Sequence, residues 1–153
     1  IWTYDAINDE WYVYHPNNPE ISNLDAMTAG YGYWVSATGN TVIKGYGSLF
    51  KERDTPPQRV LKPGWNLIGY YQRPGDDKVP VYCALSTLMD IEYGESIPTF
   101  KKYWTTLVTY DNHAKTFADV ETGDYMEPGK GYWIFMKSTE IGSYMYGPGE
   151  TCE

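Results

Sequence analysis

One sequence unit occurs twice in this chain, and the first copy lacks the front half of the second. Residues 1–11 match residues 107–117 without a gap, beginning with Ile-Trp-Thr-Tyr-Asp against Leu-Val-Thr-Tyr-Asp. Further on, residues 27–35 match residues 126–134, so that Gly-Tyr-Gly-Tyr-Trp aligns with Gly-Lys-Gly-Tyr-Trp. Residues 45–47 then match residues 145–147. An internal repeat constrains the fold strongly, because every copy has to bury the same apolar face.

The repeat predicts a modular organisation. Residues 1–47 form a half repeat of two β-hairpins, residues 48–60 form a linker with Pro56-Pro57, and residues 61–153 form a complete unit with a C-terminal tail. Because two hairpins alone bury little apolar surface, the half repeat needs a cover. The cover comes either from the complete unit or from a strand of another chain.

The pattern predicts a mainly β fold, with antiparallel sheets arranged as a small barrel or sandwich and one short helix. Short aromatic and β-branched runs bounded by Asn, Pro and Gly are typical of strands. The expected strands include residues 11–14, 32–35, 41–46, 65–71 after a Pro-Gly turn, 103–110, 116–120, 131–136 and 141–146. Residues 81–89 are expected to be the helix, and residues 90–102 a long loop.

The composition of the chain restricts which partners it can bind and in which cellular compartment it is expected. The net charge of -8 argues against nucleic acid and against anionic membrane surfaces, which need clustered Lys and Arg. No apolar run is long enough to cross a membrane, and no signal peptide is present. Residue 1 is Ile and lies inside a repeat, which indicates a fragment, a processed chain or an excised domain of a longer protein. Sixteen Tyr, the acidic balance and few Lys favour an extracellular setting.

Cys83 and Cys152 are the only cysteines, and their spacing suits neither a metal site nor a redox motif. In a secreted chain they would form one disulfide that ties the tail to the middle of the chain. The alternative is a buried free Cys83 and an exposed Cys152, and the sequence does not choose between them.

The motifs resemble a repeat of secreted and cell-surface proteins of archaea and bacteria. That repeat opens on Gly-Trp-Asn-Leu-Ile-Gly, here residues 64–69, and passes Ala84-Leu85-Ser86 and Tyr110-Asp111. It closes on Pro-Gly-Lys-Gly-Tyr-Trp, here residues 128–133. The resemblance implies an extracellular β module of a larger surface or filament protein. It implies no activity, no cofactor and no functional residues.

The sequence contains no pattern of catalytic or metal-binding residues, so we expect a protein that is not an enzyme and uses no cofactor. His15 and His113 stand outside metal-ligand spacings, and turn positions explain them better. Asp5 and Asp111 are candidates for paired carboxylates, but each follows a strand at the same repeat position, where Asp commonly accepts backbone hydrogen bonds in a turn. The acids at 76–77 and 121–124 match no calcium loop.

The aromatic side chains are the remaining functional candidates. Tyr33-Trp34 and Tyr132-Trp133 are equivalent pairs and, with Trp65, are expected to be structural positions of the repeat. In each pair one ring should face the core and the other should point away. Trp11, Tyr12 and Tyr14 are less symmetric, because Phe117, Ala118 and Val120 replace them in the second copy. These three residues are therefore the predicted partner or ligand surface, unless they fill the gap left by the missing half.

We therefore predict a structural module without enzymatic activity, at the cell surface or outside the cell, in an S-layer-like, filament or adhesion protein. Its expected partners are copies of itself or neighbouring modules of the same parent. The alternative is a carbohydrate-binding module that uses exposed Trp and Tyr. Nucleic acid and membrane insertion are not expected.

Overall fold

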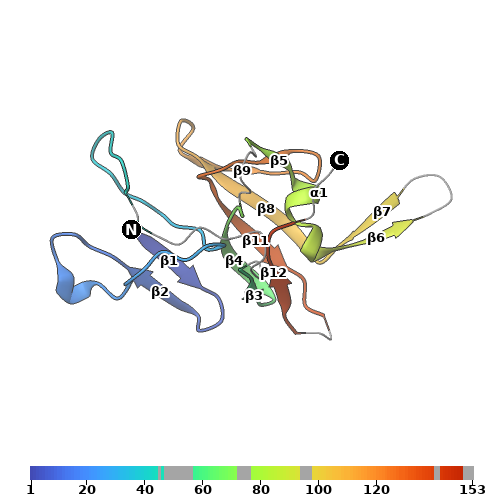
Figure 1. Ribbon diagram of the computed structural model, residues 1–153, viewed down its shortest axis with the longest axis horizontal. Helices are drawn as coiled ribbons and strands as arrows, with labels where there is room; N and C mark the ends of the chain where they lie inside the picture. The colour runs from blue at the N-terminus through green and yellow to red at the C-terminus, as the bar shows by residue number, and fades with distance from the viewer. Residues whose placement is uncertain (45, 47–56, 72–76, 94–97, 140–141, 150–153) are drawn as a thin grey trace.

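Short β-strands joined by polar turns make up most of the chain, as the aromatic and β-branched runs predict (Figure 1). The computed structural model describes all residues except 45, 47–56, 72–76, 94–97, 140–141 and 150–153. All strand pairs in the described part are antiparallel and belong to several small sheets. The mainly antiparallel β prediction is confirmed, and no sheet closes into a barrel within the described ranges.

The largest sheet has four strands and belongs to the complete unit. Its order is β4 (Gly64–Gly69), β11 (Gly131–Met136), β8 (Trp104–Asp111) and β9 (Thr116–Asp119). Alternation along β11 buries Tyr132, Ile134 and Met136 on one face and leaves Trp133 and Phe135 on the other. The prediction that one ring of the Tyr132-Trp133 pair faces the core is thus confirmed.

Helical turns and two short strand pairs cover the buried face of this sheet. They are α1 (Val81–Ala84), η2 (Ser86–Leu88), the pair β3 (Arg59–Leu61) with β12 (Tyr144–Tyr146), and the pair β5 (Val79–Pro80) with β10 (Tyr125–Met126). Val81, Leu85 and Leu88 are fully buried against the sheet, so the apolar stripe of the predicted helix is correct. The helix itself is shorter than residues 81–89, because the backbone becomes extended at Met89 to enter a strand.

The predicted loop at residues 90–102 is instead a hairpin of β6 (Met89–Tyr93) and β7 (Pro98–Lys102). It extends away from the rest of the molecule in Figure 1. The alternation in Met-Asp-Ile-Glu-Tyr is a strand pattern, which the expectation of a loop missed.

The first copy forms one hairpin, β1 (Trp2–Asp5) with β2 (Glu10–Val13), followed by the short turn η1 (Pro19–Ile21). The second predicted hairpin does not form, since residues 35–44 contain no strand. In the complete unit the corresponding strand β12 pairs with β3 rather than with β11, whose two edges are occupied by β4 and β8. Gly45 and Gly47 of the predicted match lie outside the described residues.

The predicted linker at residues 48–60 also falls largely outside the described residues. Its last two residues, Arg59 and Val60, differ from the prediction because they belong to β3 and pair with Tyr146 and Met145. The complete unit therefore begins before residue 61.

Candidate functional site: the junction of the two copies

The two copies repeat the same hydrogen bonds at equivalent residues. The Thr3 hydroxyl donates to Gly32 O (2.7 Å) in the first copy, and the Thr109 hydroxyl donates to Gly131 O (3.0 Å) in the second. Trp34 pairs with Trp2 as Trp133 pairs with Val108. The sequence match thus corresponds to a shared local structure.

The turn before each Tyr-Trp pair is also shared. The backbone N–H of Thr28 donates to the Tyr33 hydroxyl (2.7 Å), and that of Glu127 donates to the Tyr132 hydroxyl (2.8 Å). Gly30 and Gly129 both have positive φ, +82° and +76°, which favours glycine. Tyr33 and Tyr132 therefore fix the same turn, as expected for structural repeat positions.

Strand β4 joins the two copies because both of its edges are paired. One edge pairs with β11 along its whole length, and the other receives the first copy. There the N–H of Gly69 donates to Gly30 O (3.1 Å), and the N–H of Gly32 donates to Leu67 O (3.3 Å). The half repeat is thus hydrogen-bonded to a strand of the complete unit in the same chain.

This pairing brings the backbones unusually close together. A Cβ at Gly32 would lie 2.7 Å from Ile68 O, and one at Gly69 would lie 2.5 Å from Tyr31 O. A Cβ at Gly30 would collide with the ring of Tyr71. By contrast, a Cβ at Gly131, which is equivalent to Gly32, meets nothing closer than 3.8 Å. The glycines of the first copy therefore serve the junction as well as the turn.

A buried arginine spans the same junction. Arg59 is 6% exposed, and its Nη1 donates to Gly30 O (3.2 Å) and to Leu67 O (2.8 Å). Its guanidinium carbon lies 3.6 Å from the centre of the Tyr31 ring, a cation–π geometry. Burial lowers the pKa of Arg59 from its ordinary value. The side chain therefore ties β3, β4 and the first copy together.

The aromatic faces of the two copies pack on each other reciprocally. The Trp34 ring lies 5.1 Å from Tyr110 and 5.8 Å from Phe117, between ring centres. The Trp133 ring lies 5.8 Å from Tyr4 and 6.0 Å from Trp11. Tyr4 is equivalent to Tyr110, and Trp11 to Phe117, so each copy's Trp packs on the same pair of positions in the other copy. Trp65, which is 44% exposed, extends this cluster through Trp133 and Phe135.

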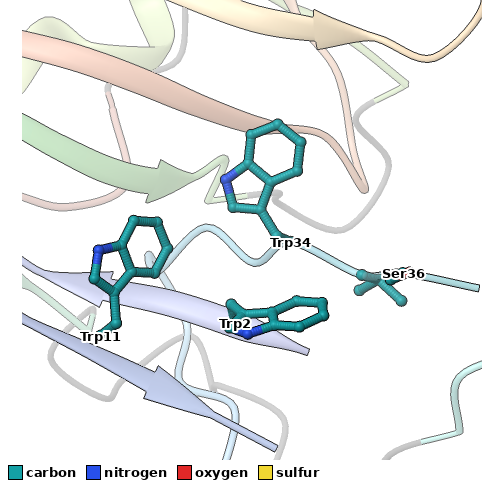
Figure 2. Close-up of a pocket in the computed structure, with 5 residues that line it drawn as sticks. Trp2, Trp11, Trp34 and Ser36 are labelled. Atoms are coloured by element: carbon teal, nitrogen blue, oxygen red, sulfur yellow. The ribbon is translucent and has the colours of Figure 1, made fainter. Parts of the chain in front are cut away.

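An open hollow of about 340 Å³ lies at the edge of this aromatic cluster. Its lining residues are Trp2, Trp11, Trp34, Val35 and Ser36. In Figure 2 the ring of Trp34 lies above Trp2 and the ring of Trp11 lies to its left, and the three rings do not share one plane. All three indoles come from the first copy.

The predicted surface of Trp11, Tyr12 and Tyr14 divides between two faces. Trp11 is opposite Tyr4 in the hairpin and lines the hollow, whereas Tyr12 is opposite the buried Thr3. Because successive side chains of a strand alternate, Tyr12 and Tyr14 point away from Trp11. The structure therefore brings only Trp11 to the hollow.

The other residues singled out in the sequence have structural surroundings. The Asp5 carboxylate accepts from Ile7 N (2.9 Å), and that of Asp111 accepts from His113 N (2.7 Å) and Ala114 N (3.1 Å), which confirms the turn interpretation. These backbone donors, that of Ala114 first, lower the pKa of Asp111. His15 and His113 are exposed.

Cys83 is buried and disulfide-bonded. Its predicted partner, Cys152, lies outside the described residues, so the pairing itself stays a prediction. Within the described ranges no group of three or more His, Cys, Asp or Glu is placed to hold a metal ion. Of the acids considered for calcium, Asp124 accepts from Glu121 N (2.8 Å) and closes a turn, while Asp76 lies outside the described residues.

Sequence reasoning missed Trp2, Arg59 and the junction role of Gly30 and Gly32. The repeat alignment could have singled out Trp2, because the second copy has the much smaller Val108 at the equivalent position. For Arg59 the local sequence contains no signal, since its partners are backbone carbonyls from distant segments.

No helix in the part of the chain that the structure describes is long and apolar enough to cross a membrane. Comparisons with protein-family models, with curated proteins and with solved structures gave no match. The resemblance to secreted repeat modules therefore remains a prediction.

Proposed function

We propose that this chain is a structural module without enzymatic activity, in an extracellular or cell-surface protein, and that it holds two repeat copies as one rigid unit. The observation that carries the proposal is the reciprocal contact in which Trp34 packs on Tyr110 and Trp133 packs on Tyr4. Aromatic pairs at these separations stabilise an interface by about 0.5–1.5 kcal/mol each beyond their buried area.

The junction combines three kinds of contact, which together resist sliding and rotation. Aromatic packing supplies apolar surface, the edge of β4 supplies backbone hydrogen bonds, and Arg59 fixes the register by bonding to Gly30 O and Leu67 O. A protein built from repeats needs fixed geometry between neighbours, since its stability and shape depend on those interfaces. This arrangement suits a surface layer or filament.

Neighbouring modules are the proposed partners. The four-stranded sheet ends at β9, whose outer edge pairs with no strand among the described residues. An open edge offers backbone N–H and C=O groups to a strand of another module. Light scattering after size exclusion, over a range of concentrations, tests this contact, and a strictly monomeric chain at the highest concentration argues against self-association.

Labelling of intact cells tests the proposed setting. An antibody raised against the folded chain should label the surface of intact cells of the organism that makes it, and protease added outside those cells should remove the signal. Labelling that appears only after the cells are lysed would contradict the proposal. An antibody against a cytoplasmic protein of the same cells serves as the control for lysis.

A further inference from the structure

We propose that the hollow formed by Trp2, Trp11 and Trp34 is a binding site for a neutral sugar ring of a soluble glycan. The proposal goes beyond the structural role, because it assigns a ligand to the hollow at the edge of the junction, where Trp2 joins two rings that the junction holds.

Trp2 carries the inference. It forms none of the ring pairs across the junction that are described above, and it is 37% exposed. At the equivalent position the second copy has Val108, which pairs with Trp133 as Trp2 pairs with Trp34. A valine therefore satisfies the packing of the repeat at this position, and the indole of Trp2 needs another explanation.

The other two walls of the hollow are held in place by the junction. One side of Trp34 packs on Tyr110 and Phe117, and Trp11 packs on Tyr4 (5.3 Å) and Trp133. Trp11 nevertheless remains 50% exposed. Rings that are fixed before a ligand arrives lose little conformational freedom on binding, which favours affinity.

The chemistry of the lining suits a sugar. The axial C–H groups of a pyranose ring stack on indole faces, while its hydroxyl groups need hydrogen-bond partners at the rim. Each indole supplies one N–H donor, and the Ser36 hydroxyl both donates and accepts. No hydrogen bond within the described part of the chain uses the side chains of Trp2, Trp11, Trp34 or Ser36. The lining is mainly apolar stacking surface, and the hydrogen-bonding side-chain groups of these residues have no partner within the described part of the chain.

The volume and shape of the hollow, together with the net charge of the chain, restrict the class of ligand that it can bind. A volume of about 340 Å³ lies at the small end of the range for ligand pockets, about 300–1,000 Å³, and fits one or two sugar rings. The three indoles surround a hollow rather than lie in one plane (Figure 2), so they suit a separate glycan chain better than the flat surface of a crystalline polysaccharide. The net charge of -8 disfavours anionic sugars.

Titration of the purified chain with a panel of neutral oligosaccharides, followed by tryptophan fluorescence and calorimetry, tests the proposal. The panel comprises gluco-, manno-, xylo- and chito-oligosaccharides, with oligogalacturonate as the anionic member. We expect saturable binding of at least one neutral member and weaker or no binding of the anionic one. Absence of binding by every neutral member at millimolar concentration would overturn the proposal.

Matched variants locate the site. Trp2→Val gives the first copy the residue that the second copy has, so the hairpin should stay folded while affinity falls at least about tenfold. Tyr14→Val removes a somewhat more exposed ring on the other face of the hairpin and should leave affinity unchanged. Loss of binding in Tyr14→Val with full binding in Trp2→Val would overturn the proposal in favour of the other face. Circular dichroism confirms that both variants are folded.

Discussion

Trp34 and Trp133 occupy the same position in the two repeat copies, and each packs its ring on the hairpin of the other copy. Trp34 packs on Tyr110 and Phe117, and Trp133 packs on Tyr4 and Trp11. The exchange is reciprocal, as in the interface of a symmetric dimer in which both partners use the same surface. A single chain therefore contains within itself the kind of interface that two subunits usually form.

Gly32 and Gly131 allow a matched test of the close approach at the junction. Gly32→Ala should lower the free energy of unfolding by about 2 kcal/mol or more, because its Cβ would lie 2.7 Å from Ile68 O, a backbone atom. Gly131→Ala should be neutral or stabilising by up to about 1 kcal/mol, since its Cβ meets only ordinary contacts. Denaturant unfolding measures both values. Equal effects of the two substitutions would contradict the asymmetry of the junction.

Arg59 is buried with its Nε unpaired, which predicts that its charge contributes little net stability. Gly30 O and Leu67 O each also accept a backbone hydrogen bond, so they stay partnered without Arg59. Arg59→Met should therefore cost no more than about 1 kcal/mol, because it keeps the packing and removes a desolvated charge. Arg59→Ala should cost about 3 kcal/mol, because it leaves a cavity beneath Tyr31. If both variants lose the same stability, the hydrogen bonds of Arg59 matter more than its packing.

The reciprocal packing predicts that Trp34→Ala and Trp133→Ala weaken the protein to a similar degree, each by about 2 kcal/mol. This value is below the range of about 3–5 kcal/mol for a fully buried ring, because both rings are partly exposed. A double-mutant cycle of Trp34 with Tyr110 should give a coupling energy of about 0.5–1.5 kcal/mol. A coupling energy of zero would mean that the two rings only lie near each other.

The lowered pKa of Asp111 predicts a stability contribution that depends on pH. The folded-state pKa is below the unfolded value of about 3.9, so the contribution is present above that pH and is lost as the pH falls through the folded pKa. Asp111→Asn should therefore be less stable than the wild type at neutral pH, and the difference should shrink in acid. Thermal unfolding of both proteins over this pH range measures the difference, and a difference that stays constant with pH would contradict the prediction.

Local sequence was sufficient to predict the elements that the chain forms by itself. The β1–β2 hairpin and the shared turn at Gly30 and Gly129 follow from turn residues and alternation, and the stripe of Val81, Leu85 and Leu88 follows from its spacing. Several strands with distant partners, such as β11, were also predicted, but the pairing of β12 and the second hairpin of the first copy were predicted incorrectly. β12 pairs with β3 rather than with residues 131–136, and residues 35–44, which were expected to contribute to a hairpin, contain no strand.

The candidate site was predictable only in part, for the same reason. The repeat alignment was sufficient to single out Trp11 and to show that Trp34 and Trp133 are equivalent. The contacts of Trp11 with Trp133 and of Trp34 with Tyr110 depend on the tertiary fold, which brings the two copies together. The proposed grouping of Trp11 with Tyr12 and Tyr14 treated consecutive aromatics as one surface. Strand geometry separates them onto two faces, and the hollow takes Trp2 instead.

Native-state hydrogen exchange is the most direct test of the central claim, that the two copies form one cooperative unit. The N–H groups of Gly32 and Trp34 in the first copy bond to Leu67 O and Trp2 O, and Ile134 lies in β11 at the centre of the second. All three amides should exchange with the same free energy of opening, equal to that of global unfolding. If Gly32 and Trp34 open at a much lower free energy than Ile134, the half repeat unfolds independently, and the account of a single rigid unit is contradicted.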